Sequence, residues 1–185
     1  MKVYLAGPDV FLSDAMAMAE RKRAICAAHG LIGLFPLDNA IERDRPIAAG
    51  EIFHANTDLM RQADAVIAHL TPFRGPSADA GTVYELGFMA GAGKLCAGYS
   101  NIPLTYPDKV RAELKSAAEA AFDRHGMMIE DFGLADNLMI VHALETFGIP
   151  LVLPRKPVED PFRDLTGFEA CVRLLAEHSA RSQPA

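Results

Sequence analysis

Two carboxylates, Asp79 and Glu85, stand six residues apart where a proline- and glycine-rich loop leads from an apolar run into a predicted helix. The crossing from a strand to a helix is where an open α/β sheet usually places its chemistry. Glu85 lies between Tyr84 and Leu86, and a carboxylate in so apolar a neighbourhood is costly unless it is hydrogen-bonded or paired. This pattern favours Glu85 as a nucleophile and Asp79 as its acidic companion.

Both acids also have a purely structural interpretation. A Glu near the start of a helix interacts favourably with the helix dipole, and an Asp just before a helix is a good N-cap. Capping and chemistry can coexist at Asp79. Tyr4, in the first apolar run, belongs to the core by default, with a hydroxyl that needs a partner. Periodicity alone does not separate the structural from the chemical interpretation.

Other chemical motifs are incomplete. The glycines before Lys94 lack the G-x-x-x-x-G-K-[ST] spacing, and no G-x-G-x-x-G follows the first strand, so neither phosphate-loop nor dinucleotide binding is predicted. His54 with Asp58, and His142 with Glu145, share helical faces but recruit no third ligand, so we expect no metal. No G-x-S-x-G marks a serine hydrolase.

Composition indicates one cytoplasmic domain over residues 1–185, with a frayed tail at 180–185. The net charge of −6 and the lack of a Lys/Arg cluster argue against a nucleic-acid partner. Cys26, Cys96 and Cys171 are odd in number and far apart, which fits a reducing compartment. No apolar run reaches the roughly 18 residues of a membrane helix, and no signal-peptide pattern precedes the first strand. We therefore expect no membrane partner.

The elements alternate between strand and helix along the chain. Strands are predicted at 2–6, 31–35, 65–70, 95–99 and 150–153, and helices at 14–29, 48–62, 80–92, 108–124, 138–147 and 165–178. Ser13 is the expected cap of the first helix and Gly30 its stop. This order predicts an α/β fold, a flavodoxin-like, doubly wound, five-stranded parallel sheet with helices on both faces. The carboxyl ends of its strands should share one crevice.

Four segments, in this order, resemble the nucleoside 2-deoxyribosyltransferase family. They are residues 3–11 (VYLAGPDVF), 36–39 (PLDN), 77–87 with the two acids at the family's six-residue interval, and 132–139 (FGLADNLM). Residues 72–75 (PFRG) are most similar to the branch from trypanosomatid parasites. The resemblance covers roughly residues 2–140, and residues from 154 onward are not diagnostic.

The resemblance implies a catalytic trio. Glu85 would attack C1′ of a 2′-deoxynucleoside, the Tyr4 hydroxyl would orient that carboxylate, and Asp79 would protonate the leaving base. A covalent sugar ester follows the retaining double-displacement logic, and an incoming base then completes the exchange. The implied substrates are a deoxynucleoside and a free nucleobase, and no cofactor is required.

The resemblance also implies binding residues. Asn137 would reach from a neighbouring subunit to the 5′-hydroxyl, so a homodimer or higher homo-oligomer with shared active sites is expected. Phe11 would pack near the base. Asp58 matches a second base-contacting acid in one branch, from which the parasite-like branch departs. Three further substrate-binding candidates lie in the matching segments: Gly7, Asn39 and Met139.

Two alternatives differ from base exchange. One is a hydrolase (N-glycosidase) of deoxynucleoside 5′-monophosphates with the same fold and nucleophile. Those relatives carry phosphate-binding serines where this chain has Asp79 and Asn137, and a carboxylate at Asp79 would repel phosphate. The other is a non-catalytic nucleotide-binding module, which would leave the set of Tyr4, Asp79, Glu85 and Asn137 as coincidence.

Overall fold

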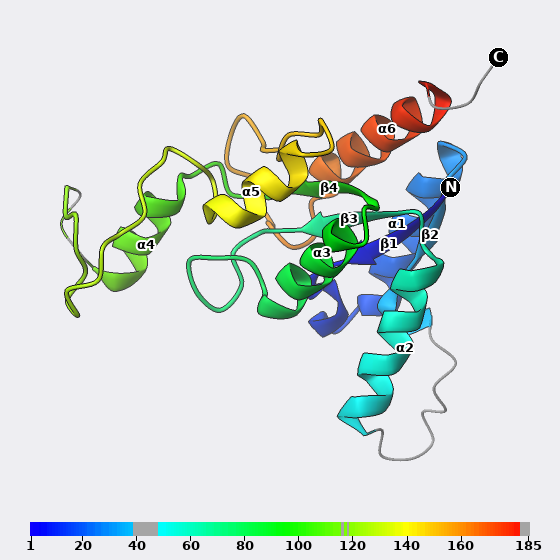
Figure 1. Cartoon of the computed structure of the whole chain (residues 1–185), viewed down its shortest axis with the longest axis horizontal. Coiled ribbons are helices and arrows are strands. Elements are labelled where there is room, and N and C mark those ends of the chain that lie inside the picture. The colour runs from blue at the N-terminus through cyan, green and yellow to red at the C-terminus, as the bar shows by residue number, and fades with distance from the viewer. Residues whose placement is uncertain (39–47, 116, 118, 182–185) are drawn as a thin grey trace.

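The computed structural model describes residues 1–38, 48–115, 117 and 119–181, and its centre is a parallel sheet. Within this part of the chain the sheet has four strands in the order β2-β1-β3-β4 (Figure 1). The strands are β1 (Lys2–Ala6), β2 (Ile32–Leu34), β3 (Ala65–His69) and β4 (Leu95–Tyr99). Tyr4 of β1 pairs with Leu34 on one side and Val66 on the other. The predicted α/β class with a parallel sheet is confirmed.

Helices cover both faces of this sheet, as its apolar strands require. On one face lie α1 (Ala15–Ala28) and α6 (Thr166–Arg181). On the other lie α2 (Ala49–Gln62), α3 (Ala80–Gly91) and α5 (Leu138–Glu145) (Figure 1). Two short 3₁₀ turns, η1 (Pro8–Phe11) and η2 (Pro36–Asp38), follow β1 and β2. No helix of the described residues is both long and apolar enough to cross a bilayer.

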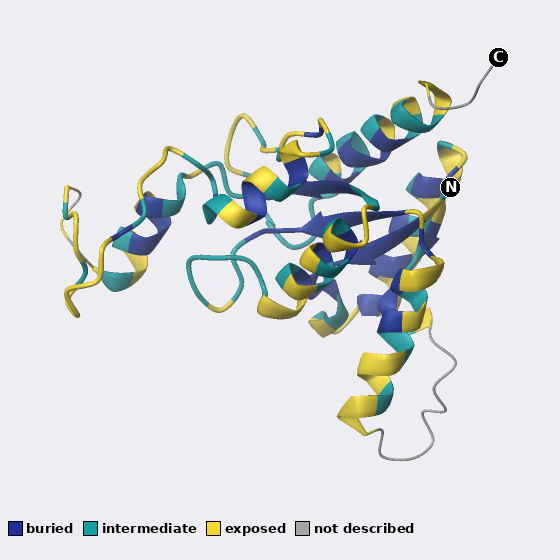
Figure 2. Cartoon of the chain, viewed as in Figure 1, coloured by how far each residue is buried: buried dark blue, intermediate teal, exposed yellow. Residues whose placement is uncertain are grey.

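The side chains of β1 alternate between two cores. Val3 and Leu5 pack with α1 and α6, whereas Tyr4 and Ala6 pack with α2, α3 and α5. This alternation follows from the two-residue period of a strand. Because both faces are covered, the strands are dark blue almost throughout in Figure 2. Because of this alternation, the side chain of Tyr4 lies on the face of the sheet that α3 covers, and α3 carries Glu85.

The fifth predicted strand, at residues 150–153, is not a strand. Val152 alone forms a parallel bridge with Tyr99 of β4, in which the Val152 N–H donates to Gly98 O at 3.0 Å and the Ser100 N–H to Val152 O at 3.0 Å. Pro150 and Pro154 flank this short apolar run, and proline cannot donate to a ladder. The sheet therefore keeps four strands, with a single paired residue at its β4 edge.

The predicted helix at 108–124 is also wrong in extent. The helix here is α4 (Tyr106–Leu114), and its N-cap is Thr105, whose hydroxyl accepts a hydrogen bond from Asp108 N–H. It ends at Lys115, which has a left-handed φ of 52°. The Ala- and Glu-rich residues that follow have helical propensity, but propensity without packing rarely sustains a short helix in water. Figure 1 shows α4 and the described loop residues after it projecting from the sheet; we call residues 104–115, 117 and 119–137 the arm.

Two predicted caps differ in outcome. Gly30 ends α1 with a φ of 72°, as expected of a glycine stop. The N-cap of α1 is Asp14 rather than Ser13, and its carboxylate makes no cap hydrogen bond. It instead accepts a hydrogen bond from Arg163 at 2.8 Å, which joins the start of α1 to the segment before α6.

Candidate active site

The predicted nucleophile and its predicted orienting group meet across the β1–α3 contact. The hydroxyl of Tyr4 donates a hydrogen bond of 2.6 Å to Oε1 of Glu85. Tyr4 has no exposed surface, so its ring is fixed in the core while its hydroxyl reaches α3. The buried hydroxyl thus has the partner that it needs, and one oxygen of Glu85 is held in place.

Burial determines the protonation of this pair. It raises the pKa of Glu85 to about 7; the charge of Asp79 adds to this rise, and the Tyr4 hydrogen bond opposes it. Burial and the charge of Glu85 raise the pKa of Tyr4 far above its usual range, so Tyr4 remains a donor. Perturbed carboxyl groups in clefts are typical of functional sites.

Glu85 lines a cavity of about 360 Å³ between α2 and α3. A cavity of this size is at the lower end of the range that holds small molecules. Its other lining residues are Gly81 and Tyr84 of α3 and Phe53, Asn56, Thr57 and Met60 of α2. The rings of Phe53 and Tyr84, at 6.1 Å between centroids, form one aromatic wall. Glu85 is the one carboxylate among these lining residues.

The α2 wall was missed as a binding surface by sequence reasoning. Phe53, Thr57 and Met60 recur at intervals of four and three residues, the spacing of one helical face. The helical pattern at 48–62 already contained this signal. That pattern predicted only a helix, and part of one face of this helix lines the cavity.

Asp79 is the N-cap of α3, as its structural interpretation predicted. Its Oδ2 accepts hydrogen bonds from Thr82 N–H at 2.9 Å and Thr82 Oγ1 at 3.0 Å. Its Oδ1 takes no such bond from the described residues. The cap therefore fixes the carboxylate while one oxygen stays available, and the charge of Asp79 is felt at Glu85.

Asp136 is a residue that sequence reasoning did not select. This buried carboxylate accepts hydrogen bonds from the Ser77 hydroxyl, from Ala78 N–H at 3.3 Å and from Asn137 N–H at 2.8 Å. It therefore ties the loop before Asp79 to the start of α5. The only signal for it was its position beside Asn137 within the fourth matching segment.

Asn137 caps α5 and does not line the Glu85 cavity. Its Oδ1 accepts from Met139 N–H at 3.0 Å, and its Nδ2 donates to Glu130 at 3.0 Å. Glu130 also accepts from Leu138 N–H at 2.9 Å, so the amide is held at a well-bonded helix start. The side chain of Met139 is largely exposed. The substrate roles of Asn137 and Met139 remain predictions.

Phe11 lies at the carboxyl end of β1 but outside the cavity. Its ring stacks on Phe73 at 5.4 Å, and the guanidinium of Arg74 lies 5.2 Å from the Phe11 ring centroid. Arg74 has a positive φ of 56°, in the left-handed region that non-glycine residues seldom adopt. The Phe11 ring is more than half exposed, so it offers a face beside the strand ends.

Behind this edge lies a buried charged network on the α1 side. Lys22 Nζ lies 2.6 Å from Asp9 Oδ2, and His69 Nδ1 lies 3.1 Å from Asp9 Oδ1. Burial alone would raise the pKa of Asp9, but Lys22 and the His69 hydrogen bond hold it well below its usual value. Burial lowers the pKa of His69. A neutral His69 then donates from Nδ1 to Asp9 and accepts at Nε2 from Thr71 Oγ1, 2.8 Å away.

The side chains of this network account for a glycine at position 7, without any contact to a substrate. A Cβ at Gly7 would lie 2.5 Å from Asp9 Oδ2 and 2.8 Å from His69 Cβ, which is closer than real Cβ contacts. The glycine therefore lets the backbone just after β1 lie close to Asp9 and His69. Whether Gly7 also touches a substrate remains a prediction.

Two remaining candidates lie elsewhere. Asp58 is on the exposed side of α2, paired with Arg61 at 2.9 Å, and is not among the lining residues. Asn39 falls outside the described residues. Among those residues, no three His, Cys, Asp or Glu side chains are arranged to hold a metal ion.

Comparison with known proteins places this geometry in context. A family model described as nucleoside 2-deoxyribosyltransferase matches residues 3–139. An uncharacterized protein of Schizosaccharomyces pombe is 34% identical over 74% of this chain and 74% of its own length. A 2-deoxyribosyltransferase from Leishmania mexicana has a similar structure, with a TM-score of 0.65 and 30% identity over 96% of this chain and 97% of its own. A conserved protein from Enterococcus faecalis, at 17% identity, shares the fold with a TM-score of 0.55 over 95% of this chain and 98% of its own.

Proposed function

This chain belongs to the nucleoside 2-deoxyribosyltransferase family, and from that premise we propose that it moves 2-deoxyribose from a deoxynucleoside to a second free base through an ester on Glu85. The observation that carries the proposal is the 2.6 Å hydrogen bond from Tyr4 to Glu85 at the edge of a cavity. A carboxylate held by one oxygen leaves the other free to reach C1′.

In the first half-reaction the Glu85 carboxylate attacks C1′ as the bond to the base breaks. The electron pair of that bond leaves with the base, and a glycosyl ester forms on Glu85. Positive charge that develops at C1′ is stabilised by the nearby carboxylate. The Tyr4 hydroxyl keeps the attacking group in one orientation, which is the positioning contribution to such catalysis.

Asp79 is the proposed acid for the departing base. The cap to Thr82 engages Oδ2, so Oδ1 is the oxygen that we assign to the base. Proton transfer to the base makes it a better leaving group. The two acids thus have separate tasks, one towards the sugar and one towards the base.

In the second half-reaction a ring nitrogen of the incoming base attacks C1′ of the ester, the bond from C1′ to Glu85 breaks, and the Glu85 carboxylate is regenerated. Asp79, which gave its proton to the first base, takes the N–H proton of the incoming base. The base must outcompete water. The apolar and aromatic side chains of Phe53, Met60 and Tyr84 give the cavity walls on which a flat ring can pack. This lining supports transfer over simple hydrolysis.

Asp79 also supports an unphosphorylated substrate. Its carboxylate is near enough to Glu85 to raise the pKa of that group, so the site already holds two acids. A 5′-phosphate would bring further negative charge to them, which is unfavourable. We therefore propose nucleosides rather than nucleoside monophosphates as substrates.

The test is a base-exchange assay with deoxyinosine and free adenine. The proposal predicts deoxyadenosine and hypoxanthine as products. Release of hypoxanthine with free deoxyribose, and no deoxyadenosine, would make the enzyme a hydrolase. Deoxyinosine 5′-monophosphate in place of deoxyinosine should react poorly; preference for it would favour the monophosphate hydrolase.

A second copy of the chain is the proposed source of Asn137 in each site. The arm and the start of α5 expose several large apolar side chains: Phe122, Met127, Met128, Phe132 and Met139. Contiguous exposed apolar patches are typical of association surfaces, and we propose that these side chains form one. Mixing inactive Glu85→Ala and Asn137→Ala chains should restore part of the activity. No recovery, with subunit exchange shown by mass-tagged chains, would count against shared sites.

A further inference from the structure

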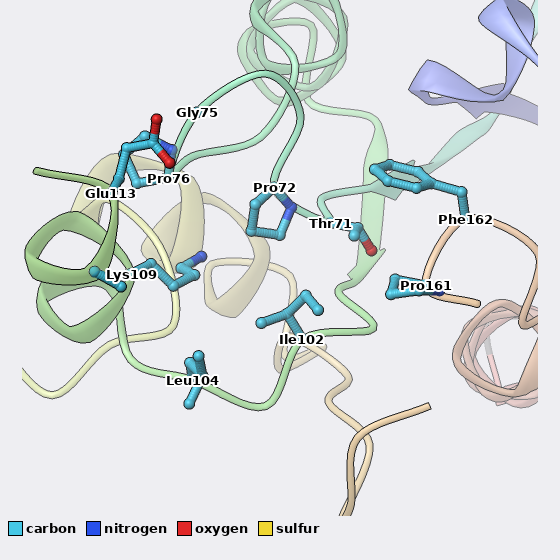
Figure 3. Close-up of a pocket in the computed structure, with 11 residues that line it drawn as sticks. Thr71, Pro72, Gly75, Pro76, Ile102, Leu104, Lys109, Glu113, Pro161 and Phe162 are labelled. Carbon is cyan, nitrogen blue, oxygen red and sulfur yellow. The ribbon is translucent and has the colours of Figure 1, made fainter. Parts of the chain in front are cut away.

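The loop of residues 71–79 leads from β3 to the proposed acid, Asp79. All of its residues are described, and they form neither helix nor strand. Figure 3 shows Pro72 and Pro76 of this loop lining a cavity of about 380 Å³, together with Lys109 of α4. Because a cavity borders the loop on that side, packing alone does not fix the position of the loop.

The end of this loop is bound to Asp136. Its Oδ1 accepts hydrogen bonds from the Ser77 hydroxyl and from Asn137 N–H, the latter at 2.8 Å. Its Oδ2 accepts from Ala78 N–H at 3.3 Å and lies 3.6 Å from Nζ of Lys109. Each oxygen therefore joins the loop to a different element: Oδ1 to the start of α5, and Oδ2 to α4.

This arrangement requires an aspartate. The side chain of Asp136 is 1% exposed, and the partners just named are hydrogen-bond donors or a cation. A carboxylate has two acceptor oxygens and no N–H, so it can serve donors on both sides at once. An asparagine of the same size would turn an NH₂ group towards one pair of these donors and leave them without an acceptor.

The bound end of the loop lies one residue before the proposed acid. Ala78 immediately precedes Asp79, which is the N-cap of α3. Asp79 is held from its other side, because its Oδ2 accepts from Thr82 N–H at 2.9 Å. Between these two anchors, the direction of Asp79 Oδ1 depends on where Asp136 holds Ala78. An acid must lie within about 2.6–3.2 Å of the atom that it protonates, so a small shift of Oδ1 slows the reaction.

We propose that Asp136 is a positioning residue for base release, which holds Ser77 and Ala78 so that Asp79 reaches the departing base. This role rests on the proposed function, because it presupposes that Asp79 protonates the base. Asp136 needs no contact with the sugar or the base in this role. Its effect on the rate passes through Asp79.

A double-mutant cycle between Asp136 and Asp79 tests this role. The measurement is the single-turnover release of hypoxanthine from deoxyinosine, the step in which the acid acts. Asp136→Asn should slow this release at least about tenfold, because a general acid contributes roughly 10²–10⁴-fold. Asp79→Asn removes the acid and keeps a good N-cap. In that background Asp136→Asn should cost less than about twofold, because losses that act through one group do not add.

The same cycle can contradict the role. No slowing by Asp136→Asn, or equal slowing in both backgrounds, would overturn it, because Asp136 would then not act through Asp79. Asp131→Asn, at an exposed acid of the arm, is the matched control and should change the rate in neither background. A parent chain that releases no hypoxanthine would overturn the proposed function, and this role with it. A parent that releases hypoxanthine but forms no deoxyadenosine contradicts only the transfer, and the cycle still decides on Asp136.

A second pair of variants decides if Asp136→Asn does not fold. Ser77→Ala removes one hydrogen bond and leaves Asp136 with Ala78 and Asn137. It should slow hypoxanthine release by about threefold or more, and only where Asp79 is present. Ser77→Thr keeps the hydroxyl and should keep the parent rate. A Ser77→Ala chain as fast as the parent, or a Ser77→Thr chain as slow as Ser77→Ala, would overturn the role.

Discussion

Asp9 and Glu85 are two largely buried acids on opposite faces of the same sheet, and they differ in their partners. Asp9 faces the ammonium of Lys22 and the ring of His69 on the α1 side. Glu85 faces the Tyr4 hydroxyl on the α3 side, with Asp79 near enough to repel it. The pKa of Asp9 is held low, whereas that of Glu85 rises to about 7.

The difference in partners supports a structural role for Asp9 and is consistent with the reactive role that we propose for Glu85. A cation compensates the burial of Asp9, so that acid stays charged and fixes the turn after β1. A neutral hydroxyl compensates Glu85 only in part, so its charged form stays high in free energy. A carboxylate in that state gains most when it forms a bond to a cationic carbon.

Removal of Glu85 should give the largest effect on activity and a small one on stability. Glu85→Gln should lower kcat for base exchange by roughly 10⁴-fold or more, as loss of a covalent nucleophile does in other enzymes. Its free energy of unfolding at pH 7 should be unchanged or higher, because a poorly compensated buried charge is gone. The base-exchange assay measures kcat, and chemical denaturation measures the free energy of unfolding. Glu177→Gln, at an exposed acid of α6, should alter neither.

For Asp9, on the other face of the sheet, the main effect should be on stability. Lys22→Met leaves Asp9 buried without its cation and should lower the free energy of unfolding by about 3–5 kcal/mol. Adding Asp9→Asn should recover part of this loss, because the unpaired charge is removed. Urea denaturation of the single and double variants checks this. A loss below about 1 kcal/mol in Lys22→Met would mean that Asp9 does not depend on its cation.

The pH dependence of stability should separate the two acids by sign. The pKa of Glu85 rises from 4.5 to about 7 on folding, so its contribution is complete below pH 4.5 and is lost as the pH rises through about 7. The difference in unfolding free energy between the parent and Glu85→Gln should therefore fall by about 3 kcal/mol between pH 4.5 and 8. Asp9, with a lowered pKa, contributes above its unfolded value of 3.8 and loses its contribution as the pH falls through its folded pKa. Denaturation curves measured across this pH range test the prediction. If folding did not raise the pKa of Glu85, the difference in unfolding free energy between the parent and Glu85→Gln would not change with pH.

Loss of the Tyr4 hydroxyl should give the smallest effect. The hydrogen bond from Tyr4 lowers the pKa of Glu85, so Tyr4→Phe should move the acid limb of kcat/KM above pH 7. At pH 7 the rate should fall by about tenfold, which corresponds to one hydrogen bond to a charged group. The loss should shrink at higher pH. If the acid limb of kcat/KM in Tyr4→Phe stays at the same pH as in the parent, whatever the size of the rate loss, then Tyr4 does not lower the pKa of Glu85.

Sequence patterns predicted much of the secondary structure of this protein. Four strands, the helices around them and the cap at Asp79 follow local rules of period, capping and turn residues. The cap of α1 was misplaced by one residue, at Ser13 instead of Asp14. The two larger errors arose where local rules compete with context. At residues 150–153 flanking prolines leave room for one bridge. Beyond Lys115 the composition is helical, but none of the described residues up to 124 is buried.

The site was predictable only in part. Asp79 and Glu85 stood out by their spacing, but the hydrogen bond to Tyr4 joins residues 81 positions apart, which periodicity cannot show. The pair of Asp9 with Lys22 carried no local signal either, and Asp136 had only its place beside Asn137 in the fourth matching segment. Their partners come from elements that meet only in the folded chain.

The central claim is that Glu85 forms a bond to the sugar, and intact-mass measurement tests it most directly. Protein mixed with deoxyinosine alone and quenched in acid should gain the mass of one deoxyribosyl group, and fragmentation should place it on Glu85. The adduct should disappear when adenine is added before the quench, and it should be absent in Glu85→Gln. An adduct that persists in Glu85→Gln, or base exchange with no adduct on Glu85, would contradict the account.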